Sequence, residues 1–163
     1  MLLLNAPLRI LVLCTGNSAR SQMAEALFNS MGKGRIVAES AGSQPAGDVN
    51  PLAISTLIEH GLMWSRHPPR SLDGLEKQAW DFVITVCDNA RESCPVFSAR
   101  TATAHWGMRD PAEETGSDDK KRAAFNDAYV LLRRRIELML ALPIERLKRA
   151  TREAKVRAIP GQK

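Results

Sequence analysis

The chain has 163 residues, of which 44% are hydrophobic, and this predicts one ordinary globular domain with a single core. The formal net charge is +5, but residues 144–157 carry six basic side chains against two acidic ones and supply most of the excess. With 5% aromatic residues the chain offers few surfaces for base stacking, so nucleic acid is not an expected partner. We interpret the basic segment as a solvated helical face.

The apolar stretch at 1–4 has no basic flank before it and is too short for a signal-peptide core, and no later run approaches a membrane span. We therefore expect a cytoplasmic protein with no membrane partner. In a reducing compartment Cys14, Cys87 and Cys94 argue against a structural disulfide framework. They lack close-spaced histidines, so a metal site is less favoured than catalysis or redox exchange.

In chain order, the apolar run at 8–13 predicts a strand buried on both faces. A helix should follow from about Ser21 to the glycines at 32 and 34, because apolar residues recur there at helical spacing. Residues 36–39 predict a short strand. Pro51 suits the first turn of a second helix, which Gly61 ends.

Residues 82–86 predict another buried strand, and residues 101–106 a weaker one. Asp118 opens a long helix with apolar residues at a spacing near 3.6, Pro143 interrupts it, and a basic helix should follow. The alternation predicts an α/β fold: three αβα layers around a central four-stranded parallel sheet. We place this domain at 1–142, and at 143–163 a basic helical extension that need not be fully ordered.

Cys14 stands where the first strand turns into the first helix, with Arg20 six positions later. The backbone N–H groups of 15–20 can fold into a concave nest, and the next helix directs its positive end to the same point. Arg20 can grip two oxygens with its planar guanidinium. The predicted oxyanion-binding set is Thr15, Gly16, Asn17, Ser18, Ala19, Arg20 and Ser21. Such a field also favours ionised sulfur, which predicts a Cys14 pKa well below the free value of about 8.5.

Two residues of this turn, Gly16 and Asn17, tolerate the unusual backbone dihedrals that a nest requires. They favour the functional interpretation over a buried structural cysteine at a strand end. Ser21 is either a donor to the Cys14 sulfur or a helix N-cap.

Cys87 follows the third predicted strand and Cys94 lies seven residues further on. Seven helical residues rise about 10 Å, whereas the Cα atoms of a disulfide lie within roughly 7 Å of each other. A bond between them would require this segment to loop out or unwind. We therefore predict a locally weak element and favour thiol exchange with Cys14. The alternative is a core residue at Cys87 and an incidental thiol at Cys94.

Asp110 precedes Pro111 on a loop after the fourth strand. A carboxyl group over an anionic pocket can supply a proton to a departing oxygen, although Asp-Pro also commonly opens a turn. His60, His67 and His105 have no convincing partner in sequence, so we expect satisfied surface or core roles for them.

Together, the stretch 14–25, the Ser40-Ala41-Gly42 turn, the Cys87 and Cys94 pair and the His105-Trp106-Gly107 run leading to Asp110 resemble the thioredoxin-coupled arsenate reductases. That family shares the fold of low-molecular-weight protein tyrosine phosphatases. The resemblance runs from about residue 8 to about 142.

The resemblance implies a relay of three cysteines. Cys14 attacks arsenate held by the loop and Arg20, Asp110 protonates the leaving oxygen, and Cys87 attacks the Cys14 sulfur so that arsenite leaves. Cys94 then takes over the disulfide from Cys14, and thioredoxin or glutaredoxin reduces it. Phosphate or sulfate would mimic the substrate, and no resident cofactor is implied.

Two points stay open. Some relatives bind potassium near Asn17, Glu25 and Ser40, which this chain retains, but residues 65–70 depart from their pattern. The alternative functions are a tyrosine phosphatase that uses Cys14 as nucleophile and Asp110 as general acid, and a non-catalytic oxyanion or redox sensor. Against the phosphatase, Ala112 and Glu113 stand where phosphatases of this fold usually carry aromatic residues.

Overall fold

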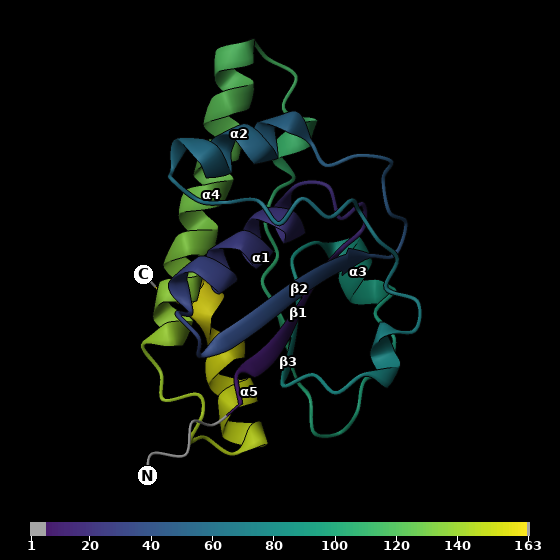
Figure 1. The fold of residues 1–163 in the computed structure, drawn as a ribbon, viewed down its shortest axis with the longest axis vertical. Helices are drawn as coiled ribbons and strands as arrows, with labels where there is room; N and C mark the ends of the chain where they lie inside the picture. Colours follow the sequence, from purple (N-terminus) through teal and green to yellow (C-terminus); the bar gives the residue numbers. More distant parts are fainter. Residues whose placement is uncertain (1–5, 163) are drawn as a thin grey trace.

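A computed structural model describes residues 6–162 and shows four strands, all parallel (Figure 1). The strands are β1 (Leu8–Cys14), β2 (Ile36–Gly42), β3 (Phe82–Thr85) and β4 (Ala102–His105), in the order β2-β1-β3-β4. The predicted α/β fold with a four-stranded parallel sheet is confirmed. The apolar stretch at 1–4 lies outside the described residues, and no helix within them is long and apolar enough to cross a bilayer.

The central strand β1 is buried on both faces, as its uninterrupted apolar run predicts: residues 10–13 each have 0% exposure. It pairs with β2 from Leu8 to Cys14 and with β3 from Ile10 to Leu13. The chain goes outward from β1 to β2 and then returns past β1 to β3, so the ends of β1 and β3 flank the topological switch point of the sheet. Ligands bind at this position in open parallel sheets.

The helices α1, α2 and α4 begin and end close to the predicted residues, and α3 and α5 had no predicted bounds. They are α1 (Arg20–Met31), α2 (Pro51–Glu59), α3 (Asp88–Glu92), α4 (Asp118–Leu140) and α5 (Arg149–Ala158). The side chain of Asn50 accepts a hydrogen bond from the Leu52 amide at 2.9 Å, and Ser117 accepts one from Lys120 at 3.3 Å. These caps satisfy amide groups that the first turns of α2 and α4 leave unpaired.

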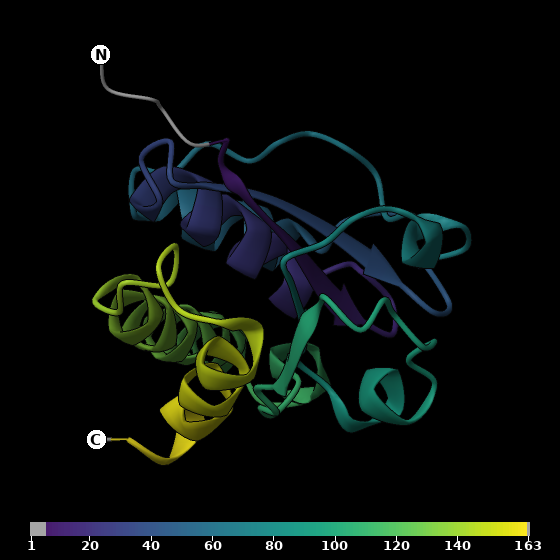
Figure 2. The same ribbon diagram turned by 90° about the horizontal axis from the view of Figure 1, so that it is seen from below.

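Figure 2 shows α1, α4 and α5 gathered on one side of the sheet. The other side carries shorter elements, the 3-10 turn Leu75–Lys77 and α3. The layer over the carboxyl end of β3 is therefore made of short segments, and its helix α3 has only five residues.

The C-terminal helix α5 differs from the solvated basic face that the charge pattern predicts. Val156 and Ile159 are buried at 0% and 1% exposure, so this segment shares the core of the domain. On the outer edge of β4, the Thr103 amide donates to Glu153 at 3.0 Å and Arg157 donates to the Thr103 carbonyl at 2.8 Å. Charged side chains of α5 thus satisfy an otherwise unpaired strand edge. The boundary at residue 142 stays a prediction.

Candidate active site

The loop that joins β1 to α1 is held from outside by its own carbonyl groups. The carbonyl oxygens of Cys14, Thr15, Gly16 and Ser18 accept hydrogen bonds of 2.8 to 3.2 Å from amides within residues 43–50. In a trans peptide the N–H points away from the C=O, so these bonds turn the N–H groups of the loop toward the opposite, concave side. This is the arrangement that an anion-binding nest requires.

Asn17 fixes the sharpest bend of the loop. It is completely buried with a φ of 51°, in the left-handed region that asparagine tolerates better than most residues. Its side-chain amide donates to the hydroxyls of Ser21 at 2.8 Å and Ser40 at 2.9 Å.

Gly16 has no left-handed φ, so the expectation of an unusual backbone there is wrong. The N-cap role for Ser21 is also wrong, because α1 begins at Arg20 and Ala19 is the capping residue.

Gly42, at the end of β2, allows the loop to approach the sheet closely. A Cβ atom at this position would lie 2.3 Å from the Thr15 carbonyl oxygen and 3.1 Å from the Asn17 Cβ. No side chain fits that space, which gives a physical reason for glycine here. The expected Ser40-Ala41-Gly42 turn is corrected, since these residues are the last three of β2.

Arg20 lines the same cavity as the loop and is largely buried, at 8% exposure. Its Nη1 donates to the Met108 carbonyl at 2.8 Å, and its Nη2 lies 3.5 Å from a carboxylate oxygen of Asp110. Its Nε is buried and has no hydrogen-bond partner among the described residues. These two contacts fix the guanidinium. Its Nε and the remaining N–H groups can donate hydrogen bonds to the oxygens of a bound oxyanion.

Asp110 reaches the same cavity from the loop after β4. One carboxylate oxygen accepts from the Ala112 amide at 3.0 Å and the other faces Arg20. The first contact caps the 3-10 turn Pro111–Glu113, and the second places a carboxyl group at the cavity. The turn-opening role and the position expected of a proton donor therefore occur in one residue.

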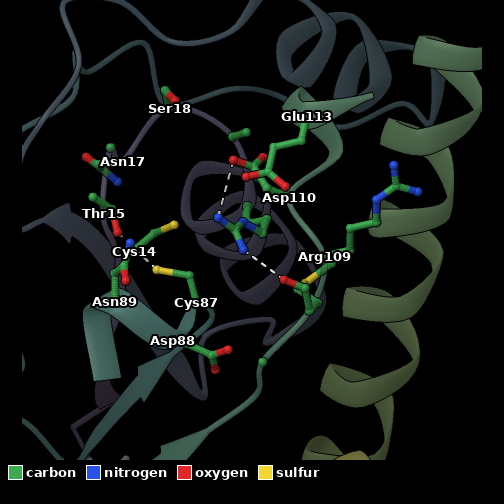
Figure 3. Close-up of a pocket in the computed structure, with 15 residues that line it drawn as sticks. Cys14, Thr15, Asn17, Ser18, Cys87, Asp88, Asn89, Arg109, Asp110 and Glu113 are labelled. Carbon is green, nitrogen blue, oxygen red and sulfur yellow. Dashed lines mark hydrogen bonds and ion pairs between the residues drawn. The ribbon is translucent and has the colours of Figure 1, made fainter. Parts of the chain in front are cut away.

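The first two cysteines lie together at the switch point. Cys14 ends β1, Cys87 follows β3, and Figure 3 shows both side chains at the same end of the cavity. The Cys87 sulfur lies 3.3 Å from the Thr15 hydroxyl and accepts from the Ala90 amide at 3.4 Å. Both thiols are buried, at 5% and 7% exposure.

The two sulfurs ionise as a pair. Interaction with Cys14, helped by Thr15 and the Ala90 amide, lowers the pKa of Cys87 to about 5. Interaction with Cys87, together with burial, raises the pKa of Cys14. This direction is opposite to the expected low Cys14 pKa, because a hydrogen bond to Cys87 favours the protonated Cys14 thiol while Arg20 acts in the other direction. The pair carries one negative charge near neutral pH, and its two ionisation steps belong to both residues.

Cys94 lies apart from this pair. It is half-buried in a second hollow of about 860 Å³, beyond α3, and burial raises its pKa. The structure thus brings together two of the three predicted thiols and leaves the third across a five-residue helix. The predicted separation of a helical Cys87–Cys94 segment matches this placement.

The cavity itself has a volume of about 840 Å³. It is lined by the predicted residues of the loop from Cys14 to Arg20, by Cys87 and by Asp110. Ser21 is buried behind the loop and is not among its lining residues. The predicted site set missed six further lining residues: Asp88, Asn89, Gly107, Met108, Arg109 and Glu113. Their positions next to Cys87 and Asp110 in sequence are the only signal that could have identified them.

Arg135 of α4 was also missed. It is buried at 8% exposure, and its Nη1 donates to the carbonyls of Trp106 at 2.9 Å and Gly107 at 3.2 Å. These two contacts fix the start of the loop that carries Met108 and Asp110. Residue spacing in the helix indicates a core position but not a polar role.

Comparison with known proteins places this chain in a family. The sequence profile described as "Low molecular weight phosphotyrosine protein phosphatase" matches residues 9–153. The chain belongs to this family. The match confirms the resemblance drawn from the motifs and continues past residue 142 into α5.

Its relatives include several arsenate reductases. That of Halalkalibacterium halodurans is 38% identical over 116 residues, which cover 71% of this chain and 83% of the relative. That of Bacillus subtilis is 35% identical with the same coverage of both chains. The crystal structure of an arsenate reductase from Archaeoglobus fulgidus superposes with a TM-score of 0.60 at 32% identity, over 78% of this chain and 98% of that one.

The same fold also occurs in phosphatases. A tyrosine phosphatase of Erwinia amylovora superposes with a TM-score of 0.63 at 24% identity, over 79% of this chain and 88% of that one. At this identity the likeness concerns the fold alone. The family profile is described as a phosphatase and the relatives are named arsenate reductases, so the side chains of the site must distinguish the two chemistries.

The residues that some family members use for potassium are satisfied within this chain. Glu25 is buried and one of its carboxylate oxygens accepts from the His67 ring at 2.6 Å and the Ser65 hydroxyl at 3.3 Å. The amide nitrogen of Asn17 faces Ser40, and its oxygen accepts from the Arg70 amide at 3.1 Å. Hydrogen-bond donors from 65–70 thus occupy these oxygens, so the group does not fit a potassium ion.

The other two histidines also have partners that sequence could not reveal. His60 stacks on Tyr129 with ring centroids 3.8 Å apart, and His105 contacts the Thr85 hydroxyl at 2.8 Å and Asp88 at 2.9 Å. His60 lies away from the cavity, whereas His105 links the end of β4 to the first turn of α3.

Proposed function

We propose that this protein is an arsenate reductase that converts arsenate to arsenite through Cys14, Cys87 and Cys94. The observation that carries the proposal is the position of two buried thiols, Cys14 and Cys87, in one cavity with the oxyanion loop, Arg20 and Asp110. A tetrahedral oxyanion held by the loop amides and Arg20 would place its central atom next to the Cys14 sulfur.

In the first step the Cys14 sulfur attacks arsenic. As the Cys14 sulfur bonds to arsenic it loses its proton, and the Cys87 thiolate that interacts with it accepts that proton. Asp110 donates a proton to the departing oxygen, which leaves as water. A covalent Cys14–arsenic(V) adduct remains, and Arg20 neutralises the charge on its oxygens.

In the second step Cys87, after losing that proton to solvent, attacks the Cys14 sulfur. The sulfur–sulfur bond forms while the sulfur–arsenic bond breaks, and its electron pair moves to arsenic. Arsenic(V) is thereby reduced to arsenic(III), arsenite leaves, and the two thiols are oxidised to a disulfide. Their side-by-side position makes this exchange direct.

In the third step the Cys94 thiolate attacks Cys87 and releases the Cys14 thiolate. Because α3 separates the two residues in the reduced protein, this helix must unwind before the Cys87–Cys94 bond can form. An external thiol reductant then reduces that disulfide. We propose thioredoxin rather than glutaredoxin, since a related structure from Corynebacterium glutamicum is described as a thioredoxin-dependent arsenate reductase. That match has a TM-score of 0.60 at 27% identity, over 83% of this chain and 65% of that one.

The phosphatase alternative uses only part of this apparatus. Water resolves the cysteinyl-phosphate intermediate of such enzymes, so neither Cys87 nor Cys94 would be required. The cavity rim carries Glu113 and Arg109, which offer a phenyl ring a poorer wall than aromatic side chains would. We therefore expect at most a residual phosphatase activity.

The test is arsenate-dependent oxidation of NADPH with thioredoxin and thioredoxin reductase, using wild type, Cys87→Ser and Cys94→Ser. We expect turnover in wild type only. In a single turnover without reductant, Cys94→Ser should still release about one arsenite per protein, whereas Cys87→Ser should release none.

Equal steady-state rates in all three proteins would contradict the relay. Hydrolysis of p-nitrophenyl phosphate that exceeds arsenate reduction, and is unaffected by both substitutions, would favour a phosphatase. Binding of phosphate without turnover of either substrate would favour an oxyanion sensor.

A further inference from the structure

The hollow beside Cys94 is a second recessed surface, separate from the cavity at Cys14. The segment after α3, the outer side of β4 and the helix α5 all contribute to its lining. Cys94 lies in it half-buried, and Val96, two residues further on, is 94% exposed. An apolar side chain so fully exposed beside a redox-active thiol suits contact with another protein surface.

The charged side chains that line this hollow all have one sign. Its charged lining residues are Arg91, Arg149 and Arg157, and among the described residues that line it none is acidic. Arg149 and Arg157 share one carboxylate, since each lies 3.2 Å from an oxygen of Glu153. Two guanidinium groups against one carboxylate leave a net positive charge, and their side chains are 43% and 55% exposed.

We propose that α5 forms part of the docking surface for the protein dithiol that reduces the Cys87–Cys94 disulfide, and that this partner presents acidic side chains next to its thiols. The inference rests on the proposed function and extends it to α5, whose packing against β4 places Arg149 and Arg157 in the lining of the hollow that also contains Cys94. A small thiol would leave Val96 in water, whereas a protein surface covers both the apolar tip and the basic rim.

The exchange at this surface balances. A thiolate of the partner attacks the Cys94 sulfur, and the Cys87 thiolate leaves and takes a proton from solvent. The second thiol of the partner loses its proton and attacks the partner's own bonded sulfur, which releases the Cys94 thiolate. The partner loses two electrons and becomes a disulfide, while this protein regains two thiols. The basic rim accelerates the encounter and orients the partner without taking part in bond exchange.

The test compares Arg149→Glu with Arg133→Glu. Arg149 is paired with Glu153 four residues later on α5, and Arg133 is paired with Glu137 four residues later on α4, each at 3.2 Å. Both substitutions therefore break the same kind of helical ion pair and change the net charge equally, but Arg133 does not line the hollow. A third variant, Arg149→Gln, removes the charge without reversing it.

The first readout is the rate at which an acidic bacterial thioredoxin reduces protein whose cysteines have been oxidised beforehand, which needs no arsenate. We expect Arg149→Glu to lower the second-order rate constant about 5- to 10-fold at low salt, and Arg149→Gln about 2- to 3-fold. Arg133→Glu should change it less than about 1.5-fold, and the differences should shrink near 0.5 M salt.

Arsenate turnover with dithiothreitol is the second readout, and it should be the same for all variants and wild type. If no variant turned over arsenate with dithiothreitol, but the rate of reduction by thioredoxin still depended on Arg149, arsenate reduction would be rejected and the docking surface retained. Equal thioredoxin rates for Arg149→Glu and Arg133→Glu would overturn the docking proposal. It would also be overturned if dithiothreitol turnover fell by the same factor, or if only reduction by glutathione were slowed.

Discussion

The loop at 14–20 and the segment at 87–94 lie at the same edge of the sheet but are built differently. Four carbonyl groups of the loop are bonded to residues 43–50, and Asn17 is fully buried within it. In the other segment α3 has five residues, and only Ala90 among them is buried. A binding site gains from a geometry fixed before the ligand arrives, whereas a disulfide relay needs a segment that unfolds at little cost.

This contrast means that damage to the loop should impair oxyanion chemistry and leave disulfide transfer intact. Changes around Cys87 should instead alter the ionisation of the thiols.

The largest effect is expected from Arg20→Lys. Lysine keeps the charge but loses the planar fork, and with it the contact to the Met108 carbonyl. We predict that kcat/KM falls about 100- to 1000-fold for arsenate and for p-nitrophenyl phosphate alike. The control is Arg109→Lys, since Arg109 lines the same cavity with a side chain that is 70% exposed. Thioredoxin should reduce the oxidised Arg20→Lys protein at the wild-type rate, and a slow reduction would refute the separation.

Gly42→Ala should damage the loop through its support. The added methyl group would lie 2.3 Å from the Thr15 carbonyl oxygen, so the loop must shift. We expect about 1 to 3 kcal/mol lower free energy of unfolding, measured with urea, and about a 10- to 100-fold lower kcat/KM.

Gly47→Ala is the matched control for this substitution. A Cβ at Gly47 meets nothing within 4 Å, and its φ is not positive. It should leave both the free energy of unfolding and kcat/KM unchanged. A Gly42→Ala protein as active as Gly47→Ala would mean that the loop is less rigid than its hydrogen bonds indicate.

The ionisation of the thiol pair can be tested with Cys87→Ser. Cys87 is the first cause of the raised Cys14 pKa, and the Arg20 charge acts in the opposite direction. Removing the neighbouring thiolate should therefore lower the Cys14 pKa by at least about one unit. The measurement is the pH dependence of Cys14 alkylation by iodoacetamide, located by mass spectrometry. In wild type at pH 7, labelling should favour Cys87 over Cys14, and the opposite preference would contradict the assignment of the thiolate.

These tests also mark what the sequence could and could not predict. The strands at 8–13 and 82–86 follow from continuous apolar runs, and the start of α2 follows from Pro51, because these signals are local. The oxyanion loop was predictable because its donors are backbone groups of one short stretch. The ionisation of Cys14 could not be predicted, because it depends on the thiol of Cys87, which follows another strand of the sheet.

Contacts of charged side chains with residues far away in the sequence could not be predicted either. The basic composition of α5 predicts a solvated face, yet Glu153 and Arg157 satisfy the edge of β4 through contacts to Thr103. The partner of Glu25, His67, lies 42 positions away in the chain. Neither contact leaves a periodic pattern in the sequence.

The smallest predicted effect is that of Thr15→Val. Thr15 belongs to the loop at 14–20 and contacts Cys87 of the other segment. The Thr15 hydroxyl lies 3.3 Å from the Cys87 sulfur and helps to lower its pKa to about 5. Because a hydrogen bond to the charged form favours that form, its loss should raise the pKa of Cys87 by about one unit. The pH at which Cys87 alkylation falls to half of its maximal rate should therefore rise, while the alkylation rate at pH 7 stays nearly unchanged. Thr15→Ser retains the hydroxyl and should follow the wild-type curve, and a shift as large as that of Thr15→Val would assign the effect to the lost methyl group instead.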